Sequence, residues 1–430
     1  MAGFLKHVLN LLQDSRKANR RSGLSLRDIQ SLEKRSLLAA DFQIVKDINP
    51  SLTPDSSSPE NFIAIGSIVY FAATTDSGSA LWRVNGTAGV PVIVKTFGEN
   101  FSSRPQNLTN VSGVLYFTVN DGTNGVELWK SDGTEAGTVM VKDIRGSGSS
   151  SPSQLTNLNG TLFFAADDGA NGVELWKSNG TSTGTVLVKD LHPGTHQQYQ
   201  YGFYGSGYLA TVPNSSAPTS LINVGGTLYF AATDETSGRE LWRSDGTAAG
   251  TVLVKDIFTG TYDTYQQLGA FGSYPVTIPN SSDPKELTNV GGTLYFTAKD
   301  GSTGNELWKT DGTSVGTSLV KDIFAGTSGS SPSYLINVQG SLYFAASEST
   351  TGRELWKSSG TEAGTAMVSD IAAGNVSSTP RKTTNVEGLI YFSANDGSSG
   401  TELWRTDGTG TGTVLVKDAP WEVTARHLSG

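Results

Sequence analysis

Short apolar runs recur along residues 42–418, and each is bounded by Gly, Asp, Asn or Ser. Within a repeat the runs take four forms, SQLTNLNG (153–160), TLYFAA (227–232), ELWKS (127–131) and TVLVKDI (251–257). Alternating apolar and polar positions predict β-strands, and Gly or Asp between them predicts tight turns. Each repeat is therefore expected to form four short antiparallel strands.

A Trp in the third run marks the period of the repeat. It stands at Trp82, Trp129, Trp176, Trp242, Trp308, Trp356 and Trp404. The spacings are 47, 47, 66, 66, 48 and 48 residues. Units of about 40 to 50 residues with four strands each are typical of β-propeller blades. We predict an all-β protein, a β-propeller of seven four-stranded blades over residues 42–420, followed by a short tail at 421–430.

The middle strands of each unit are apolar on both faces, as blades packed between two neighbours require. Each Trp is expected to bury about 150 to 250 Å² between blades. Glu127 shares a strand face with Trp129 by simple alternation. The Glu of this strand and the Lys and Asp of the VKDI run are expected to be solvated or in cross-strand ion pairs.

Ring closure is not fixed by the repeat count. Residues 42–48, FQIVKDI, are an extra copy of the fourth strand ahead of the first unit, while the last unit already has its own at 413–418. We expect seven blades, with residues 42–48 adding an outer strand to the last. The alternative is an eight-bladed ring completed by a partner or by sequence missing here.

The N-terminal segment, residues 1–41, differs from the repeats. Its helical periodicity and a capping box at Ser25 and Asp28 predict a short helical extension. It has eight Lys or Arg and four Asp or Glu, a net charge of +4. Because the whole chain has a net charge of −9, residues 42–430 carry −13.

The acidic charge of residues 42–430 argues against a nucleic-acid groove, and no apolar run is long enough to span a bilayer. With no Cys, disulfides and thiolate metal sites are excluded.

Two insertions explain the 66-residue spacings. They occupy residues 192–216 and 260–282, in loops between the fourth strand of one unit and the first strand of the next. Half of the 14 Tyr lie in them, namely Tyr199, Tyr201, Tyr204, Tyr208, Tyr262, Tyr265 and Tyr274. Because loops carry function on rigid scaffolds and Tyr is a common contact residue, these tyrosines are the candidate ligand-binding residues. Packing of the loops on the rim and on each other is the alternative.

The other polar motifs favour structure over chemistry. Asp-Gly loops such as NDGTNG (120–125) lack the oxygen spacing of a calcium loop and are expected to be turns. His192 and His196 are four residues apart in a Pro-Gly loop without a third ligand, so no metal site is expected. No cofactor is expected and no catalytic residue is proposed. Carboxylate-dependent glycoside chemistry needs only two acids and stays an alternative.

Two stretches resemble known families. The repeat units, for example ELWKSDGTEAGT (127–138), resemble the ELWxxDGT, or hyalin-like, repeats of bacterial surface proteins. That family is defined by its sequence and has no common activity. SLEKRSLLAAD (31–41) is similar to a segment near the start of many exported planctomycete proteins. The resemblance implies an exported protein, at the cell surface or outside the cell.

The sequence therefore predicts a non-enzymatic binding or scaffold module that contacts glycan or protein. A glycoside hydrolase or lyase with its site at the central channel, and self-assembly by strand exchange through residues 42–48, are the alternatives.

Overall fold

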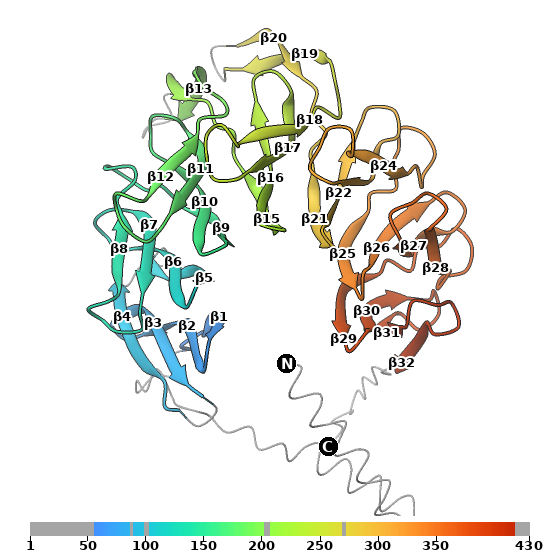
Figure 1. Cartoon of the computed structure of the whole chain (residues 1–430), viewed down its shortest axis with the longest axis horizontal. Coiled ribbons are helices and arrows are strands. Elements are labelled where there is room, and N and C mark those ends of the chain that lie inside the picture. Colours follow the sequence, from blue (N-terminus) through green and yellow to red (C-terminus); the bar gives the residue numbers. More distant parts are fainter. Residues whose placement is uncertain (1–55, 87–88, 99–102, 202–206, 269–271, 418–430) are drawn as a thin grey trace, which may run out of the picture.

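The computed structural model describes residues 56–86, 89–98, 103–201, 207–268 and 272–417. These residues form seven four-stranded antiparallel sheets and two two-stranded hairpins, with no α-helix among them. The sheets follow one another in chain order as the blades of an arc (Figure 1). The predicted all-β propeller of seven four-stranded blades is therefore confirmed.

Three of the predicted elements lie outside the described residues. They are the helical extension at 1–41, the extra strand at 42–48 and the tail at 421–430.

Each blade places its strands in chain order from the centre of the arc to its rim. The first, innermost strands are β1 (Glu60–Ile65), β5 (Gln106–Val111), β9 (Ser153–Leu158), β15 (Thr219–Val224), β21 (Lys285–Val290), β25 (Ser333–Val338) and β29 (Arg381–Val386). The second strands are β2 (Ile68–Thr75), β6 (Val114–Asn120), β10 (Thr161–Asp167), β16 (Thr227–Asp234), β22 (Thr293–Lys299), β26 (Ser341–Glu348) and β30 (Leu389–Asn395).

The third strands carry the repeated Trp. They are β3 (Gly78–Asn85), β7 (Val126–Ser131), β11 (Val173–Ser178), β17 (Gly238–Ser244), β23 (Asn305–Thr310), β27 (Gly352–Ser358) and β31 (Thr401–Thr406). The outer strands are β4 (Val92–Gly98), β8 (Val139–Lys142), β12 (Val186–Lys189), β18 (Val252–Lys255), β24 (Ser318–Lys321), β28 (Thr365–Ser369) and β32 (Val414–Lys417). We number the blades 1 to 7 from β1–β4 to β29–β32.

Tight turns join the first and second strands, as predicted. In blade 3, Asn159 and Gly160 both have positive φ, 51° and 87°. Two successive positive φ values are those of a type I′ turn, whose twist matches the strands of a hairpin. Asn157 stabilises the turn by accepting a hydrogen bond from the Gly160 amide at 2.9 Å.

Consecutive blades meet through two unlike faces. One face of blade 3 presents Phe163 and Leu175, and it packs on the face of blade 4 that presents Phe230 and Trp242. We call these the Leu face and the Trp face. The same pairing joins each blade to the next from blade 1 to blade 7. The Trp of blades 2 to 7 thus packs between blades, where buried apolar area stabilises the stack.

The Lys of the VKDI run connects blades, so the expectation that it is solvated or in a cross-strand ion pair is wrong. Lys189 Nζ donates to the Thr251 carbonyl of blade 4 at 3.0 Å. The same Nζ lies 5.9 Å from the centre of the Trp242 ring, in cation-π geometry. Stacking of blades brings these groups together, and the equivalent Lys of blades 2 and 5 repeats the arrangement.

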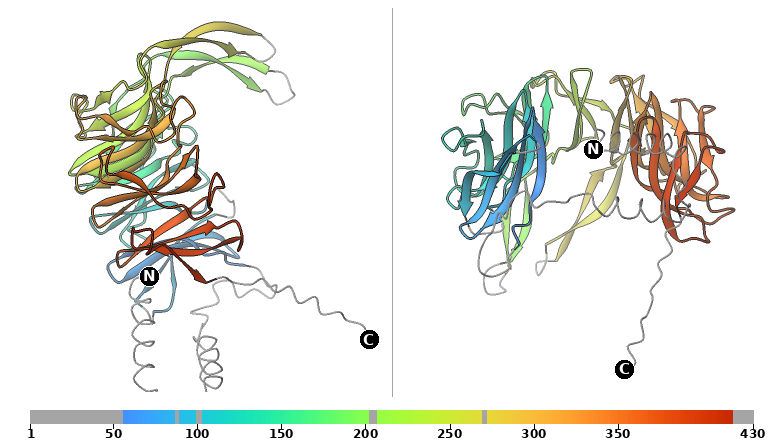
Figure 2. Two further views of the ribbon diagram at one scale, coloured as in Figure 1. Left: turned by 90° about the vertical axis from the view of Figure 1, so that its right-hand side faces the viewer. Right: turned by 90° about the horizontal axis from the view of Figure 1, so that it is seen from below.

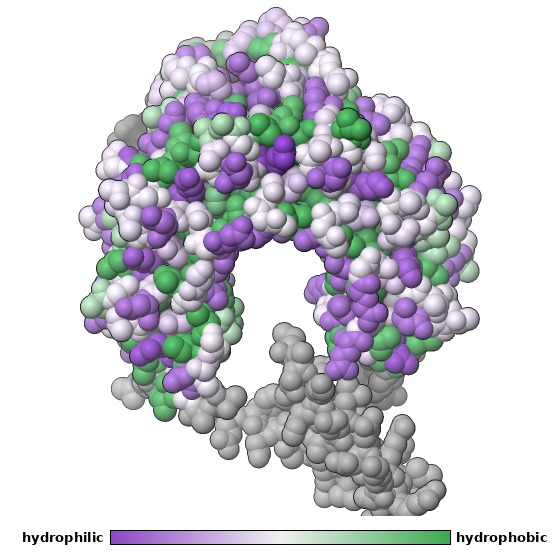
Figure 3. Space-filling model, viewed as in Figure 1, coloured by the Kyte–Doolittle hydropathy of each residue, from purple (hydrophilic) through white to green (hydrophobic). Residues whose placement is uncertain are grey.

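The two ends of the arc differ from its middle. In blade 7, Leu403 is 47% exposed, whereas its equivalent Leu241 in blade 4 is fully buried. In blade 1, Phe71 and Trp82 of the Trp face are buried, and Phe62 stacks on Phe71 at 5.4 Å. Among the described residues no eighth sheet fills the opening between β1 and β29 (Figures 1 and 3).

Candidate functional site

The two insertions form β-hairpins that project from one face of the arc (Figure 2). The first is β13 (Thr195–Tyr201) with β14 (Gly207–Pro213), and the second is β19 (Thr261–Gln267) with β20 (Ser273–Pro279). They leave the arc between blades 3 and 4 and between blades 4 and 5. Gln266 Nε2 of β19 donates to the Gln197 carbonyl of β13 at 3.0 Å, so the hairpins lie side by side.

A buried carboxylate anchors the base of each hairpin. Glu174 on β11 accepts hydrogen bonds from the Ser216 amide at 2.7 Å and from its hydroxyl at 2.5 Å. Glu240 on β17 holds Ser282 in the same way, at 2.7 and 2.5 Å. Each serine stands three residues after the returning strand of its hairpin, so the hairpins are fixed to the blades that precede them.

These Glu side chains are fully buried, which corrects the expectation that they are solvated or in ion pairs. Burial, the largest cause, raises the pKa of Glu174 and of Glu240 to about 7, although the hydrogen bonds from Ser216 and Ser282 oppose the shift. The equivalent Glu side chains of blades 2, 5 and 6 bind a Ser in the same way and have raised pKa values.

The hairpin tyrosines are exposed but do not converge on one surface. Tyr208, Tyr262, Tyr265 and Tyr274 are 56, 50, 64 and 38% exposed. Tyr262 and Tyr274 share one face of the second hairpin, because Tyr262 pairs with Ile278 and Tyr274 with Gln266. Tyr265 lies on the opposite face of the same hairpin.

The first hairpin divides its tyrosines in the same way. Tyr208 pairs with Gln200, while Tyr199, which is half-buried, pairs with Leu209 on the other face. Tyr201 lies within β13, and Tyr204 lies outside the described residues. Alternation thus places the tyrosines whose side chains are described on opposite faces of the two neighbouring hairpins.

A second polar feature was not predicted from the sequence. The second residue of every innermost strand has φ between 53° and 59°, the left-handed region that non-Gly residues rarely adopt. We call these residues the polar ring. Its members are Asn61, Asn107, Gln154, Ser220, Glu286, Tyr334 and Lys382. Blades 1 and 2 both carry Asn here and the other five blades all differ, whereas the following residues repeat closely as Leu-Thr-Asn-Val or Leu-Ile-Asn-Val in blades 2 and 4 to 6. Comparison of the repeats with one another would have revealed this position.

A β-bulge produces the polar ring. In blade 5, Lys285 pairs with Thr297 and Thr288 pairs with Tyr295, so Glu286 and Leu287 together oppose one residue of β22. The bulge shifts the register at the same place in all seven blades. Since innermost strands line the centre of the arc, the polar ring lies along the channel that is visible in Figure 3, which is open between blades 1 and 7.

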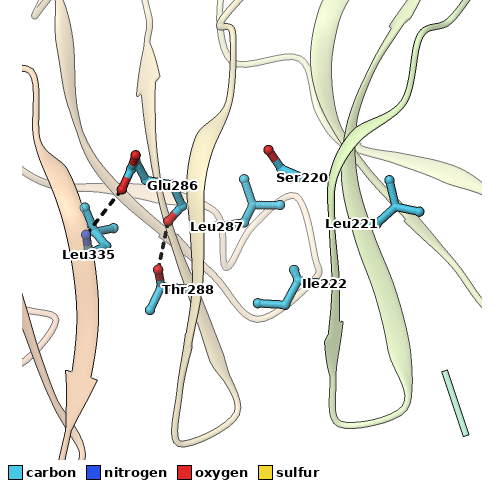
Figure 4. A pocket seen from close by; sticks show the side chains of 7 residues that line it. All are labelled: Ser220, Leu221, Ile222, Glu286, Leu287, Thr288 and Leu335. Carbon is cyan, nitrogen blue, oxygen red and sulfur yellow. Dashed lines mark hydrogen bonds between the residues drawn. The ribbon is translucent and has the colours of Figure 1, made fainter. Parts of the chain in front are cut away.

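A shallow hollow of ≈ 420 Å³ lies between the innermost strands β15, β21 and β25 (Figure 4). Ser220 and Glu286 of the polar ring contribute to its wall, together with Leu335. Glu286 Oε2 accepts a hydrogen bond from the Leu335 amide at 3.3 Å, which ties blade 5 to blade 6.

The polar groups expected to serve as turns do so. Asp121 accepts hydrogen bonds from the amides of Thr123 and Asn124 at 2.9 and 2.8 Å. Burial opposes its ionisation, but these hydrogen bonds outweigh burial and lower the pKa of Asp121.

The two His side chains lie at the base of the first hairpin. His192 contacts the Ser215 carbonyl and His196 contacts the Asn214 side chain. The part of the chain that the structure describes contains no group of three His, Asp or Glu placed to hold a metal ion.

No protein-family model and no curated protein matches the sequence. Among solved structures, the chain is similar to a prolyl endopeptidase, with 11% identity and a TM-score of 0.43 over 84% of this chain and 49% of that one. For the acylaminoacyl peptidase of Pyrococcus horikoshii the identity is 9% and the TM-score 0.34, over 84% of this chain and 52% of that one. The chain thus spans about half the length of each of these peptidases.

A third similar structure is the β-propeller domain of the Trilobed protease from Pyrococcus furiosus, described as having an open velcro topology. The identity is 10% and the TM-score 0.36, over 85% of this chain and all of that domain. Likenesses at these identities carry no information on activity. The class of protein defined here, a β-propeller with two inserted hairpins, rests on the seven sheets themselves.

Proposed function

We propose that this propeller is a non-enzymatic binding or scaffold module, exported to the cell surface or beyond, that contacts a glycan or a protein through the face bearing the two hairpins. The observation that carries the proposal is the pair of hairpins, side by side and anchored on buried carboxylates, with four exposed tyrosines. Rigid aromatic side chains on a fixed support bind with little loss of conformational entropy.

The arrangement of acids supports binding rather than glycoside cleavage. Glycosidases place two carboxyl groups on either side of the scissile bond. Among the described innermost strands the only carboxylates are Glu60 in blade 1 and Glu286 in blade 5, with three blades between them. Glu60 is moreover paired with Arg104 at 2.9 Å.

The proposed location rests on the resemblance of residues 31–41 to export segments and of the repeats to those of surface proteins. In the described part of the chain, no helix is both long and apolar enough to cross a membrane.

A glycan array and a pull-down from surface-protein extracts test the proposal. Wild type is compared with a Tyr262→Ser, Tyr274→Ser variant, which removes the aromatic groups from one hairpin face. Tyr265→Ser is the matched control, because it removes an exposed Tyr from the other face of the same hairpin. Loss of a ligand in the double variant and its retention in the control would support the proposal. Equal binding by all three proteins, or none by wild type, would refute it.

A further inference from the structure

The positive charges of the innermost strands lie on one side of the channel. In the first two positions of these strands, blades 1 to 4 carry Glu60 and otherwise only uncharged residues. Blades 5 and 7 carry Lys285, Arg381 and Lys382. Tyr334 of blade 6 stands between them. We call Lys285, Tyr334, Arg381 and Lys382 the basic sector.

The strands of the basic sector are adjacent. Leu335 of β25 donates its amide to Glu286 of β21 at 3.3 Å. Thr383 of β29 donates its hydroxyl to the Tyr334 carbonyl at 3.1 Å. The four side chains therefore lie on three consecutive innermost strands, and all four are exposed, Tyr334 by 41%.

Positive charge exceeds negative charge here. None of the ion pairs among the described residues includes Lys285, Arg381 or Lys382. Arg353, whose guanidinium donates to the Ser331 carbonyl at 3.0 Å and to the Ser333 hydroxyl at 2.7 Å, adds a further charge beside the sector. Burial is the largest cause and lowers the pKa of Arg353; among the neighbouring charges Arg381 lowers it too, whereas Tyr334 and Glu286 raise it. Glu286 offers one negative charge against these four, in a chain whose total is −9.

We propose that the basic sector binds an acidic polysaccharide that carries uronic carboxylates. The planar fork of Arg381 matches a carboxylate, which it can bind through two parallel hydrogen bonds. The exposed ring of Tyr334 offers an apolar surface and a hydroxyl to a sugar ring. Gln154 and Ser220, farther along the polar ring, supply hydroxyl and amide groups of the kind that bind neutral sugar hydroxyls.

Few cations and uncharged polar neighbours favour this ligand over a nucleic acid. A nucleic-acid groove neutralises a phosphate in each successive nucleotide with a continuous basic stripe. Here three exposed cations lie on one sector of the channel, and the first four blades offer uncharged residues at the polar ring.

The chain provides a template for a variant that should keep its fold. Blade 2 carries Gln106 and Asn107 where blade 7 carries Arg381 and Lys382, with φ of 53° at Asn107 and 55° at Lys382. Arg381→Gln with Lys382→Asn therefore removes two charges and keeps residues that this backbone accepts elsewhere in the molecule. Arg405→Ala, an exposed cation on β31 of the same blade, is the matched control.

The test measures binding of the full chain to oligogalacturonate and to its methyl ester by calorimetry at low and at moderate salt. We expect wild type and Arg405→Ala to bind the acid but not the ester. The double variant should lose about tenfold or more in affinity, as expected when charge-assisted hydrogen bonds are removed. Unchanged affinity of the double variant, equal binding of acid and ester, or no binding by wild type would overturn the proposal. A further outcome is that wild type binds single-stranded DNA more tightly than oligogalacturonate, with that binding lost in the double variant. That result would assign the sector to nucleic acid and would also overturn the proposal.

The basic sector uses none of the hairpin tyrosines, although the innermost strands begin on the face that bears the hairpins. A Tyr262→Ser, Tyr274→Ser variant should bind oligogalacturonate like wild type, so either proposal can fail while the other holds.

Discussion

The buried carboxylates at the hairpin bases predict that the protein is less stable at pH 8 than at pH 5. Glu174 and Glu240 are fully buried, and burial raises the pKa of each from 4.5 to about 7. A group whose folded pKa is raised contributes its stability fully below the unfolded pKa and loses it as pH rises through the folded pKa. The loss therefore falls between pH 4.5 and pH 7 and is complete at pH 8.

The magnitude follows from the shift. One pKa unit corresponds to about 1.4 kcal/mol, so each carboxyl should lower the free energy of unfolding by about 2 to 3 kcal/mol between pH 5 and pH 8. The Asp side chains of the turns act in another window. Hydrogen bonds from Ser399 and Ser398 lower the pKa of Asp396 to about 2, and that stability is lost only as pH falls below about 4.

Urea unfolding of wild type and Glu240→Gln at pH 5, 6, 7 and 8 measures the effect. At pH 5 the variant should be less stable by about 1 to 2 kcal/mol, because an amide accepts fewer of the three hydrogen bonds from Ser282 and Ile257. By pH 8 this difference should vanish or reverse, since Gln does not ionise. Glu402→Gln, at the equivalent half-buried position of blade 7, should change stability less.

Two results would refute this reasoning. One is a wild-type stability that is constant or rises from pH 5 to pH 8. The other is a Glu240→Gln variant with the full pH dependence of wild type.

Three further predictions concern the stacking of blades. Gly312→Ala should cost about 2 to 4 kcal/mol in thermal unfolding, because φ is +92° and the new Cβ would lie 2.2 Å from a tyrosine hydroxyl of the preceding blade. Gly397 has a similar φ of +83°, but a Cβ there would have no atom within 4 Å. If Gly397→Ala costs as much stability as Gly312→Ala, the contact with the tyrosine hydroxyl contributes nothing to the loss. Leu241→Ala, at a fully buried site, should lower the free energy of unfolding by about 2 to 5 kcal/mol. Leu403→Ala, at a site 47% exposed, should lower it by less than about 1.5 kcal/mol. Equal losses of the two variants in urea unfolding would contradict the Leu-face assignment. Lys189→Met should lower stability by about 1 to 2 kcal/mol through loss of its carbonyl and Trp contacts, and an unchanged unfolding midpoint would show that these contacts contribute nothing.

The strands, the turns and the number of blades could be predicted because their causes are local. The short apolar run TLYFAA and the Gly of each turn act over a few residues, and the Trp spacing counts the units directly. The seven sheets follow this pattern strand by strand.

The role of the repeated Glu could not be predicted in this way. Its charge predicts that Glu174 is solvated, but its partner Ser216 stands 42 residues later and is brought to it only by the return of the chain from the hairpin. The faces of the hairpin tyrosines were equally out of reach, because they depend on the pairing register. The polar ring had a signal in the sequence, since its residue changes at Gln154, Glu286 and Lys382 while its neighbours repeat.

The unlike faces of the blades also limit how copies of this protein can join. The free Leu face of blade 7 complements a Trp face and not itself, so two copies cannot cover it by two-fold symmetry. Joining would have to run head to tail, from blade 7 of one molecule to blade 1 of the next. In blade 1, however, Ala73, Ala80 and Trp82 are already buried within their own chain, to 0, 0 and 2% exposure. One end of the molecule thus presents an exposed Leu403 on its Leu face, whereas Ala73, Ala80 and Trp82 at the other end are already buried.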